Sequence, residues 1–104
     1  MIDIFITRKN REIYKIEVSG HSGYDIEERD IVCASVSSAL MLTVNAILNV
    51  AKAKCIADEK DAKVSLEMLE PNEKAQDFLK AFCDHIGVLS QDYSQYINLK
   101  YSKE

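Results

Sequence analysis

Apolar and polar residues alternate in the first part of the chain. Residues 2–7 carry isoleucine at every second position, and residues 13–18 repeat the alternation after the polar stretch 8–11. A period of two is typical of a strand with one buried face. The short polar stretch between the two segments predicts a turn, so we expect a β-hairpin.

The longest apolar-rich segment, residues 31–53, has a different character. Asp30 precedes it and is a suitable N-cap, because its carboxylate can accept a free backbone N–H of the first turn. The segment is apolar on nearly every side, which predicts a central helix packed on more than one face. Seven polar residues interrupt it, so we interpret it as a buried helix and not as a membrane span.

The second half of the chain repeats strand and helix patterns. Residues 55–57 predict a short strand, 58–61 a charged turn and 63–68 another strand. Pro71 and Asn72 then break the chain and cap a helix whose apolar side chains share one face, and 96–101 alternates again. The expected order is β-β-α-β-β-α-β. We therefore predict an α/β (α+β) fold with a single small sheet of about four to five strands and two helices, forming one domain over residues 1–104.

Composition narrows the class of protein. The 104 residues are 47% hydrophobic and 29% charged, as in ordinary globular proteins. The net charge is −4 and no basic stripe is present, which argues against direct nucleic-acid binding and favours a basic partner. The N-terminus has no basic segment followed by an apolar one, so we expect no signal peptide and a cytoplasmic protein with no membrane partner.

The three cysteines are best considered singly. An odd number of cysteines with wide spacing argues against a disulfide framework. The sequence contains neither a Cys-x-x-Cys nor a His-x-x-x-His pair, which argues against a structural zinc site. We expect no metal and no cofactor. Cys55 and Cys83 are expected to be core or boundary thiols, and His85 a surface or boundary residue.

Cys33 could be a nucleophile. If Asp30 caps the helix, Cys33 lies in the first turn, where unpaired N–H groups and the helix dipole favour a thiolate. His21 lies at the end of the second predicted strand, just before a loop that returns to the helix start. An imidazole there could accept the thiol proton. The alternative is that Cys33 is a small buried hydrophobe and that the pair arises by chance.

Other groups could support this pair. Asp30 could orient His21 through the second ring nitrogen, although capping competes for the same carboxylate. Ser37 lies four residues after Cys33, on the same helical face, and could steady the thiol. We expect an oxyanion hole from backbone N–H groups near Cys33, since these should be unpaired. Residues 22–29 are expected to form an exposed, mobile loop.

The residues on either side of this loop resemble a known signature. Gly20-His21, the loop, and then Asp-Ile-Val-Cys-Ala-Ser-Val-Ser over residues 30–37 resemble the pattern of the ribosomal-processing cysteine protease family Prp. That pattern is a Gly-His pair, a short loop and Asp-Ile-Val-Cys-Ala-Ala-Val-Ser. Both halves occur in the family's order and at its separation. The chain departs from the pattern at Glu28, where the family often has glycine, and at Ser35, which replaces a common alanine.

The resemblance implies a function and a set of site residues. Family members are small homodimeric α/β cysteine endopeptidases that remove an N-terminal extension from a large-subunit ribosomal protein. The family's Cys–His pair falls on Cys33 and His21, with Asp30, Ser37 and Gly20 as supporting residues. The loop, thought to move when substrate binds, comprises the expected substrate-binding residues Ser22, Gly23, Tyr24, Asp25, Glu27, Glu28 and Arg29.

Some interpretations stay open at the level of sequence. The acidic residues Asp25, Glu27 and Glu28 could attract a basic ribosomal protein, but solvated loop charges explain them as well. Tyr93, Tyr96 and Tyr101 could line a peptide groove, although they could equally pack in the core or at a dimer contact. A non-enzymatic ribosome-associated binding protein, or a redox-active or acyl-transferring thiol protein, is the alternative function. Thiol alkylation and a cleavage assay separate these classes.

Overall fold

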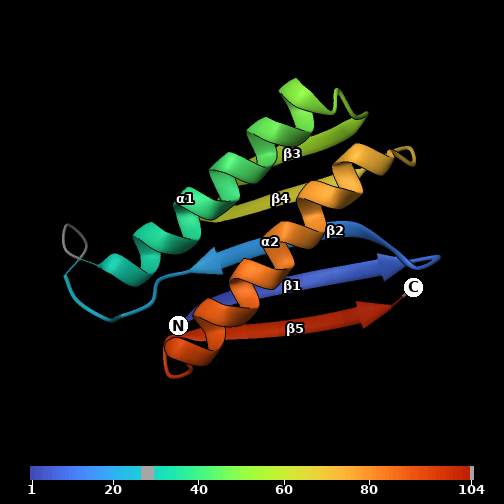
Figure 1. The fold of residues 1–104 in the computed structure, drawn as a ribbon. Coiled ribbons are helices and arrows are strands. Elements are labelled where there is room, and N and C mark those ends of the chain that lie inside the picture. Colours follow the sequence, from blue (N-terminus) through green and yellow to red (C-terminus); the bar gives the residue numbers. More distant parts are fainter. Residues whose placement is uncertain (27–29, 104) are drawn as a thin grey trace.

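The computed structural model describes residues 1–26 and 30–103. Its elements follow the predicted order (Figure 1). They are β1 (Ile2–Lys9), β2 (Glu12–Gly20), α1 (Ile31–Asn45), continued by the π-helical turn η2 (Ala46–Val50), β3 (Cys55–Lys60), β4 (Lys63–Met68), α2 (Glu73–Asp92) and β5 (Ile97–Lys103). The predicted fold class is confirmed.

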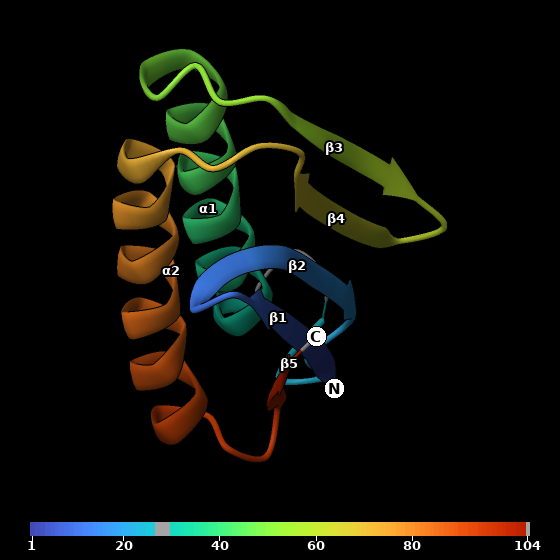
Figure 2. The ribbon, with the colours of Figure 1, turned by 90° about the vertical axis from the view of Figure 1, so that its right-hand side faces the viewer.

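The five strands form one mixed sheet in the order β3-β4-β2-β1-β5. β1 pairs antiparallel with β2 and parallel with β5, while β4 pairs antiparallel with both β2 and β3. Both helices lie on the same face of this sheet, as Figure 2 shows from the side. The chain thus has two layers, and the buried core lies between them.

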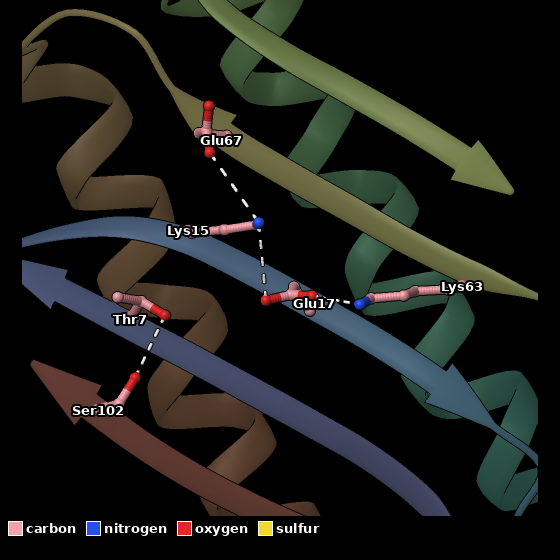
Figure 3. A network of polar contacts seen from close by, with 6 residues as sticks. All are labelled: Thr7, Lys15, Glu17, Lys63, Glu67 and Ser102. Carbon is pink, nitrogen blue, oxygen red and sulfur yellow. Dashed lines mark hydrogen bonds and ion pairs between the residues drawn. The ribbon is translucent and has the colours of Figure 1, made fainter.

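The alternation in the sequence is explained by the two faces of the sheet. Ile2, Ile4 and Ile6 of β1 face the helices and are fully buried. The opposite face carries polar side chains, among them Lys15, which lies 3.8 Å from Glu17 and 4.0 Å from Glu67 (Figure 3). An antiparallel sheet with one solvated face requires this pattern.

Two tight turns set the lengths of the strands. Asn10 and Arg11 both have positive φ, 53° and 67°, and so do Asp61 and Ala62, at 53° and 60°. These values are those of two-residue type I′ hairpin turns. β1 and β3 therefore continue to Lys9 and Lys60, and the predicted turns at 8–11 and 58–61 were too long. Charge at these positions is tolerated because the strand ends are exposed.

The first helix is less enclosed than its composition predicts. α1 buries Val32, Val36, Leu40 and Thr43 against the sheet, whereas Leu42 on the outer side is 71% exposed. The prediction of packing on more than one face was wrong for the single chain, because one layer of two helices covers only the inner side. Ile31–Val50 is long and apolar enough to cross a membrane, and 28% of its most apolar 18-residue window is buried.

The end of α1 is joined to the start of α2. Lys52 follows η2 with a φ of 51°, and the Ala53 N–H donates to the Ile47 carbonyl at 3.1 Å. Asn72 accepts the Ala75 N–H at 2.9 Å, which confirms it as the predicted cap of α2. Its amide also donates to the Ala51 carbonyl at 3.1 Å. One side chain therefore closes both helix ends.

Candidate active site

The candidate site lies where β2 ends and α1 begins (Figure 1). Gly20, the last residue of β2, has a φ of +88°. A Cβ at this position would lie 2.4 Å from the Met1 carbonyl oxygen, so a side chain would be both strained and in collision. Glycine lets the chain turn out of the sheet here, and two residues later Ser22 contacts the start of α1.

Asp30 is the N-cap that the sequence predicts. Its backbone is extended, with φ −78° and ψ 94°, and its Oδ1 accepts the N–H groups of Val32 at 3.1 Å and Cys33 at 2.9 Å. The Asp30 carbonyl accepts the Ala34 N–H at 3.1 Å. Cys33 is therefore held in the first turn of α1, half-buried and as a free thiol.

Ser22 connects the loop to this helix start. Its N–H donates to Cys33 Sγ at 3.3 Å, and its hydroxyl donates to Asp30 Oδ2. The same hydroxyl accepts the Tyr24 N–H at 3.0 Å. Ser22 is only 4% exposed, so the prediction that the whole loop is exposed was wrong at this residue. A polar side chain can be buried here because each of its groups is bonded.

The carboxylate of Asp30 is strongly stabilised. The hydrogen bond from the Ser22 hydroxyl, followed by that from the Cys33 N–H, holds the pKa of Asp30 below its ordinary value. Hydrogen bonds to an ionised carboxylate favour the charged form. Asp30 therefore remains an anion at neutral pH and keeps its hold on both the helix and the loop.

His21 is exposed and adjacent in sequence to the residue that contacts the sulfur. In the described part of the chain, no hydrogen bond joins His21 to Cys33 or Asp30. The second carboxylate oxygen of Asp30 accepts the Ser22 hydroxyl, and the possible orientation of His21 by Asp30 stays a prediction. The backbone nitrogen of Ser22, the residue after His21, lies 3.3 Å from Cys33 Sγ, so His21 is next in the chain to the residue that contacts the thiol.

The other predicted supporting residues lie further away or outside the description. Ser37 is exposed one turn along α1, and the hydrogen bonds of the described residues do not connect it to Cys33. Gly23 has a φ of +72°, and the Asp25 carboxylate accepts the Ile26 N–H at 2.7 Å. The predicted loop residues Glu27, Glu28 and Arg29 lie outside the described residues.

Tyr24 attaches the loop to the C-terminal end of α2, which lies on the same side of the helical layer as the start of α1. Its ring packs edge-on against Tyr93 and Tyr96, with centroid distances of 5.9 Å and 5.2 Å. Tyr93 caps the end of α2 and Tyr96 precedes β5. Sequence reasoning singled out Tyr93 and Tyr96 but missed their contact with Tyr24, because the pattern does not place the loop beside this turn.

The remaining thiols differ from Cys33 in their surroundings. Cys55 and Cys83 pack against or within the core, and burial raises the pKa of both. A raised pKa keeps a thiol protonated and unreactive. Among residues 1–26 and 30–103, no group of three His, Cys, Asp or Glu side chains could hold a metal ion.

The chain is similar to several solved structures. An essential ribosomal processing protease Prp from S. aureus, with a covalently linked product peptide, has a TM-score of 0.92 and 25% identity, over 97% of this chain and 99% of that one. Its complex with a substrate peptide gives a TM-score of 0.86 and 24% identity over the same shares. A protein from Streptococcus mutans gives a TM-score of 0.81 and 28% identity, over 100% and 96%.

Sequence comparison assigns the family. No curated protein matches the chain significantly. The profile of the family described as cysteine protease Prp matches residues 1–98, which is nearly the whole chain. The resemblance seen in the residues around His21 and Cys33 therefore extends to the full fold, and the chain belongs to the Prp family of cysteine proteases.

Proposed function

We propose that this cysteine protease removes the N-terminal extension of a large-subunit ribosomal protein, with Cys33 as nucleophile and His21 as base. The observation that carries the assignment is the position of Cys33 Sγ. It lies in the first turn of α1 and accepts the N–H of the residue that follows His21. A reactive thiol needs partial exposure and a base nearby. Cys33 is half-buried and follows a loop that begins at His21, whereas burial raises the pKa of Cys55 and Cys83, and this contrast supports Cys33 as the nucleophile.

The chemistry follows from this arrangement. His21 takes the thiol proton, and the Cys33 sulfur forms a bond to the carbonyl carbon of the peptide while the C=O electrons move to oxygen. When the C=O bond re-forms, the C–N bond breaks and imidazolium protonates the leaving amine. Water, deprotonated by His21, then adds to the thioester, and the second collapse expels Cys33 and releases the new carboxyl end.

The substrate class is supported by the relatives. The S. aureus protein is a ribosomal processing protease and was captured with a substrate peptide and with a covalently linked product peptide. Covalent attachment in that protein agrees with a nucleophilic thiol. The net charge of −4 favours encounter with a basic ribosomal protein, because opposite charges raise association rates.

Trimming of the extended ribosomal protein from the same organism tests the assignment. We expect Cys33→Ala and His21→Ala to lower the cleavage rate by about 10³-fold or more while the unfolding transition is retained. Cys55→Ala is the matched control, since it removes a half-buried thiol remote from the site, and it should cleave at close to the wild-type rate. Normal cleavage by the Cys33→Ala protein would refute the proposal.

We further propose that the protease works as a cytoplasmic homodimer. Met41 and Leu42 on the outer side of α1 are 66% and 71% exposed, and an apolar groove of about 710 Å³ runs between α1 and α2. The residues lining this groove include no Lys, Arg, Asp or Glu. Exposed apolar patches of this kind mark contact surfaces, and a second copy would cover the face that one layer of helices leaves open.

Sedimentation equilibrium tests the dimer. The wild type should sediment at twice the chain mass, and Leu42→Glu should sediment as a monomer because a charge would be buried in the contact. Lys100→Glu, an exposed change on the open face of the sheet, is the control and should stay dimeric. A monomeric wild type, or recovery of the protein in the membrane fraction of cells, would contradict this proposal.

A further inference from the structure

The helix start that holds the nucleophile has its own N–H donors engaged. We expected unpaired donors near Cys33 to form an oxyanion hole. Instead, the N–H groups of Val32 and Cys33 bond to Asp30 Oδ1, and that of Ala34 bonds to the Asp30 carbonyl. The lowered pKa of Asp30 means that the carboxylate does not release these donors by protonation at neutral pH. The nucleophile's own N–H is therefore committed elsewhere.

One donor remains directed at the reacting atom. The Ser22 N–H lies 3.3 Å from Cys33 Sγ, measured from nitrogen to sulfur. A thiol sulfur is a weak hydrogen-bond acceptor, so the Ser22 N–H forms a stronger hydrogen bond when a negatively charged substrate oxygen replaces the sulfur as its acceptor. After thiolate attack, that oxygen is separated from sulfur by a single carbon. A donor within hydrogen-bond distance of the free sulfur can then reach the oxygen with little movement.

The same donor is rigidly held before substrate arrives. The Ser22 hydroxyl donates to Asp30 Oδ2 and accepts the Tyr24 N–H at 3.0 Å. Ser22 is 4% exposed, so its bond to Asp30 is buried and its bonds to the Tyr24 N–H and to Cys33 Sγ are partly buried. A donor that is fixed in advance costs no reorganisation during the reaction, which is the property that makes oxyanion stabilisation effective.

We propose that the backbone N–H of Ser22 is the oxyanion donor of this protease, held in place by the bond between the Ser22 hydroxyl and the Asp30 cap. The inference rests on the proposed role of Cys33 as the nucleophile. Thiolate addition converts the substrate carbonyl to an oxyanion, which accepts the Ser22 N–H. Collapse returns the electron pair to the C=O bond and expels the amine, which takes its proton from His21.

An amide-to-ester exchange tests this donor without altering any side chain. A synthetic segment 1–32 with an ester in place of the Ser22 N–H is ligated at Cys33 to residues 33–104, and the full chain is refolded. We expect kcat for the extended ribosomal protein to fall about 10²- to 10³-fold, with KM within about twofold of the all-amide chain. The matched control has the ester at Tyr24, which removes a bond to Ser22 Oγ but leaves the Ser22 N–H intact. This control should lose much less activity.

Three results overturn the proposal. The first is a kcat of the Ser22 ester chain within about threefold of the all-amide chain. The second is an equal loss of kcat in the Ser22 and Tyr24 ester chains. The third is a loss of kcat in the Ser22 ester chain that is matched by a fall in its melting temperature. These outcomes are distinct from failure of the proposed function, in which the Cys33→Ala chain would cleave. If only Cys33→Ala is inactive while the Ser22 ester is normal, the nucleophile stands and the donor is refuted.

A second measurement uses the unaltered protein, in case the ester chain does not refold. A peptide aldehyde of the substrate sequence adds to Cys33 and leaves a tetrahedral oxygen in the position of the oxyanion. In protein labelled with ¹⁵N at serine, we expect the Ser22 amide proton to move downfield and to exchange more slowly with solvent. An unchanged Ser22 resonance on formation of the adduct would contradict the assignment.

Discussion

The two helices begin in the same way but for different purposes. Asp30 and Asn72 each have an extended backbone, and one side-chain oxygen of each accepts from the following first turn, two N–H groups at Asp30 and one at Asn72. Their second polar group is what differs. Asn72 donates to the Ala51 carbonyl and so ties α2 to the end of α1, whereas Asp30 accepts the Ser22 hydroxyl and so ties α1 to the loop beside His21.

The difference separates a structural cap from a functional one. Asn72 is neutral, and its side-chain hydrogen bonds within the described residues go to the backbone of Ala51 and Ala75, so they serve the packing of the helical layer. Asp30 is charged, and the loop that it holds brings the Ser22 N–H to Cys33 Sγ. The same capping rule therefore gives stability at one end of the layer and an ordered nucleophile at the other.

The largest expected effect tests how strictly the backbone conformation at Gly20, next to the candidate active site, is constrained. Gly20→Ala places a Cβ 2.4 Å from the Met1 carbonyl oxygen at a φ of +88°. We expect a loss of about 2–4 kcal/mol in the free energy of unfolding, measured by urea titration, and a matching loss of cleavage. Gly87→Ala is the control, because its Cβ would meet no atom within 4 Å in α2, and helix propensity should then stabilise the protein by up to about 1 kcal/mol.

The next effect compares the two caps directly. Asn72→Ala should cost about 1 kcal/mol of unfolding free energy, with kcat within about twofold of the wild type. Asp30→Ala removes the acceptor for two N–H groups and for the Ser22 hydroxyl, so it should destabilise more and also lower kcat about tenfold to a hundredfold. Steady-state kinetics and urea unfolding on both variants are the measurements. Equal loss of kcat in the two variants would show that the caps are not functionally different.

Sequence pattern predicted the elements better than it predicted the contacts between them. The alternation in residues 2–7 and the cap at Asp30 are local rules, and the structure has both. The role of Ser22 depends on the loop folding back over the helix start, which periodicity does not encode. Periodicity likewise could not show that Asp30 Oδ2 accepts the Ser22 hydroxyl, and the possible orientation of His21 by Asp30 stays a prediction.

Exposure of the helices was the other misjudged feature. An apolar segment such as 31–53 predicts burial, but it does not say which molecule provides the covering surface. In the single chain Leu42 is 71% exposed, because two helices form only one layer on the sheet. The Prp-like signature of residues 20–37, and not hydrophobic periodicity, connected the Cys33 segment to proteolysis, and the family profile over residues 1–98 confirms the family.

A smaller effect concerns the end of α1 opposite the active site. Lys52 adopts a φ of 51°, a conformation that favours glycine after a helix. Lys52→Gly should raise the unfolding free energy by roughly 0.5 kcal/mol and leave kcat unchanged, because this end of the layer has no part in the chemistry. Lys80→Gly, within α2, is the control and should instead destabilise by about 1 kcal/mol. A lower stability of the Lys52→Gly protein in urea would contradict the prediction.

The smallest expected effect is on the pH dependence of the free energy of unfolding, to which the charged cap Asp30 contributes and the neutral cap Asn72 does not. The Ser22 hydroxyl and the Cys33 N–H hold the pKa of Asp30 below its ordinary value of about 4. Since the unfolded chain then binds more protons below that value, this stabilisation is present above pH 4 and is lost as the pH falls through the folded pKa. Asp30→Asn should flatten the acid limb of the stability curve by up to about one bound proton, while Asn72→Ala should leave its slope unchanged.

Glu17, whose pKa is lowered first by its bond to Lys63 on the open face, should contribute in the same direction, and Glu17→Gln calibrates that share. Urea unfolding between pH 3 and 7 measures all three slopes, and an unaltered slope in Asp30→Asn would mean that the two caps are electrostatically equivalent.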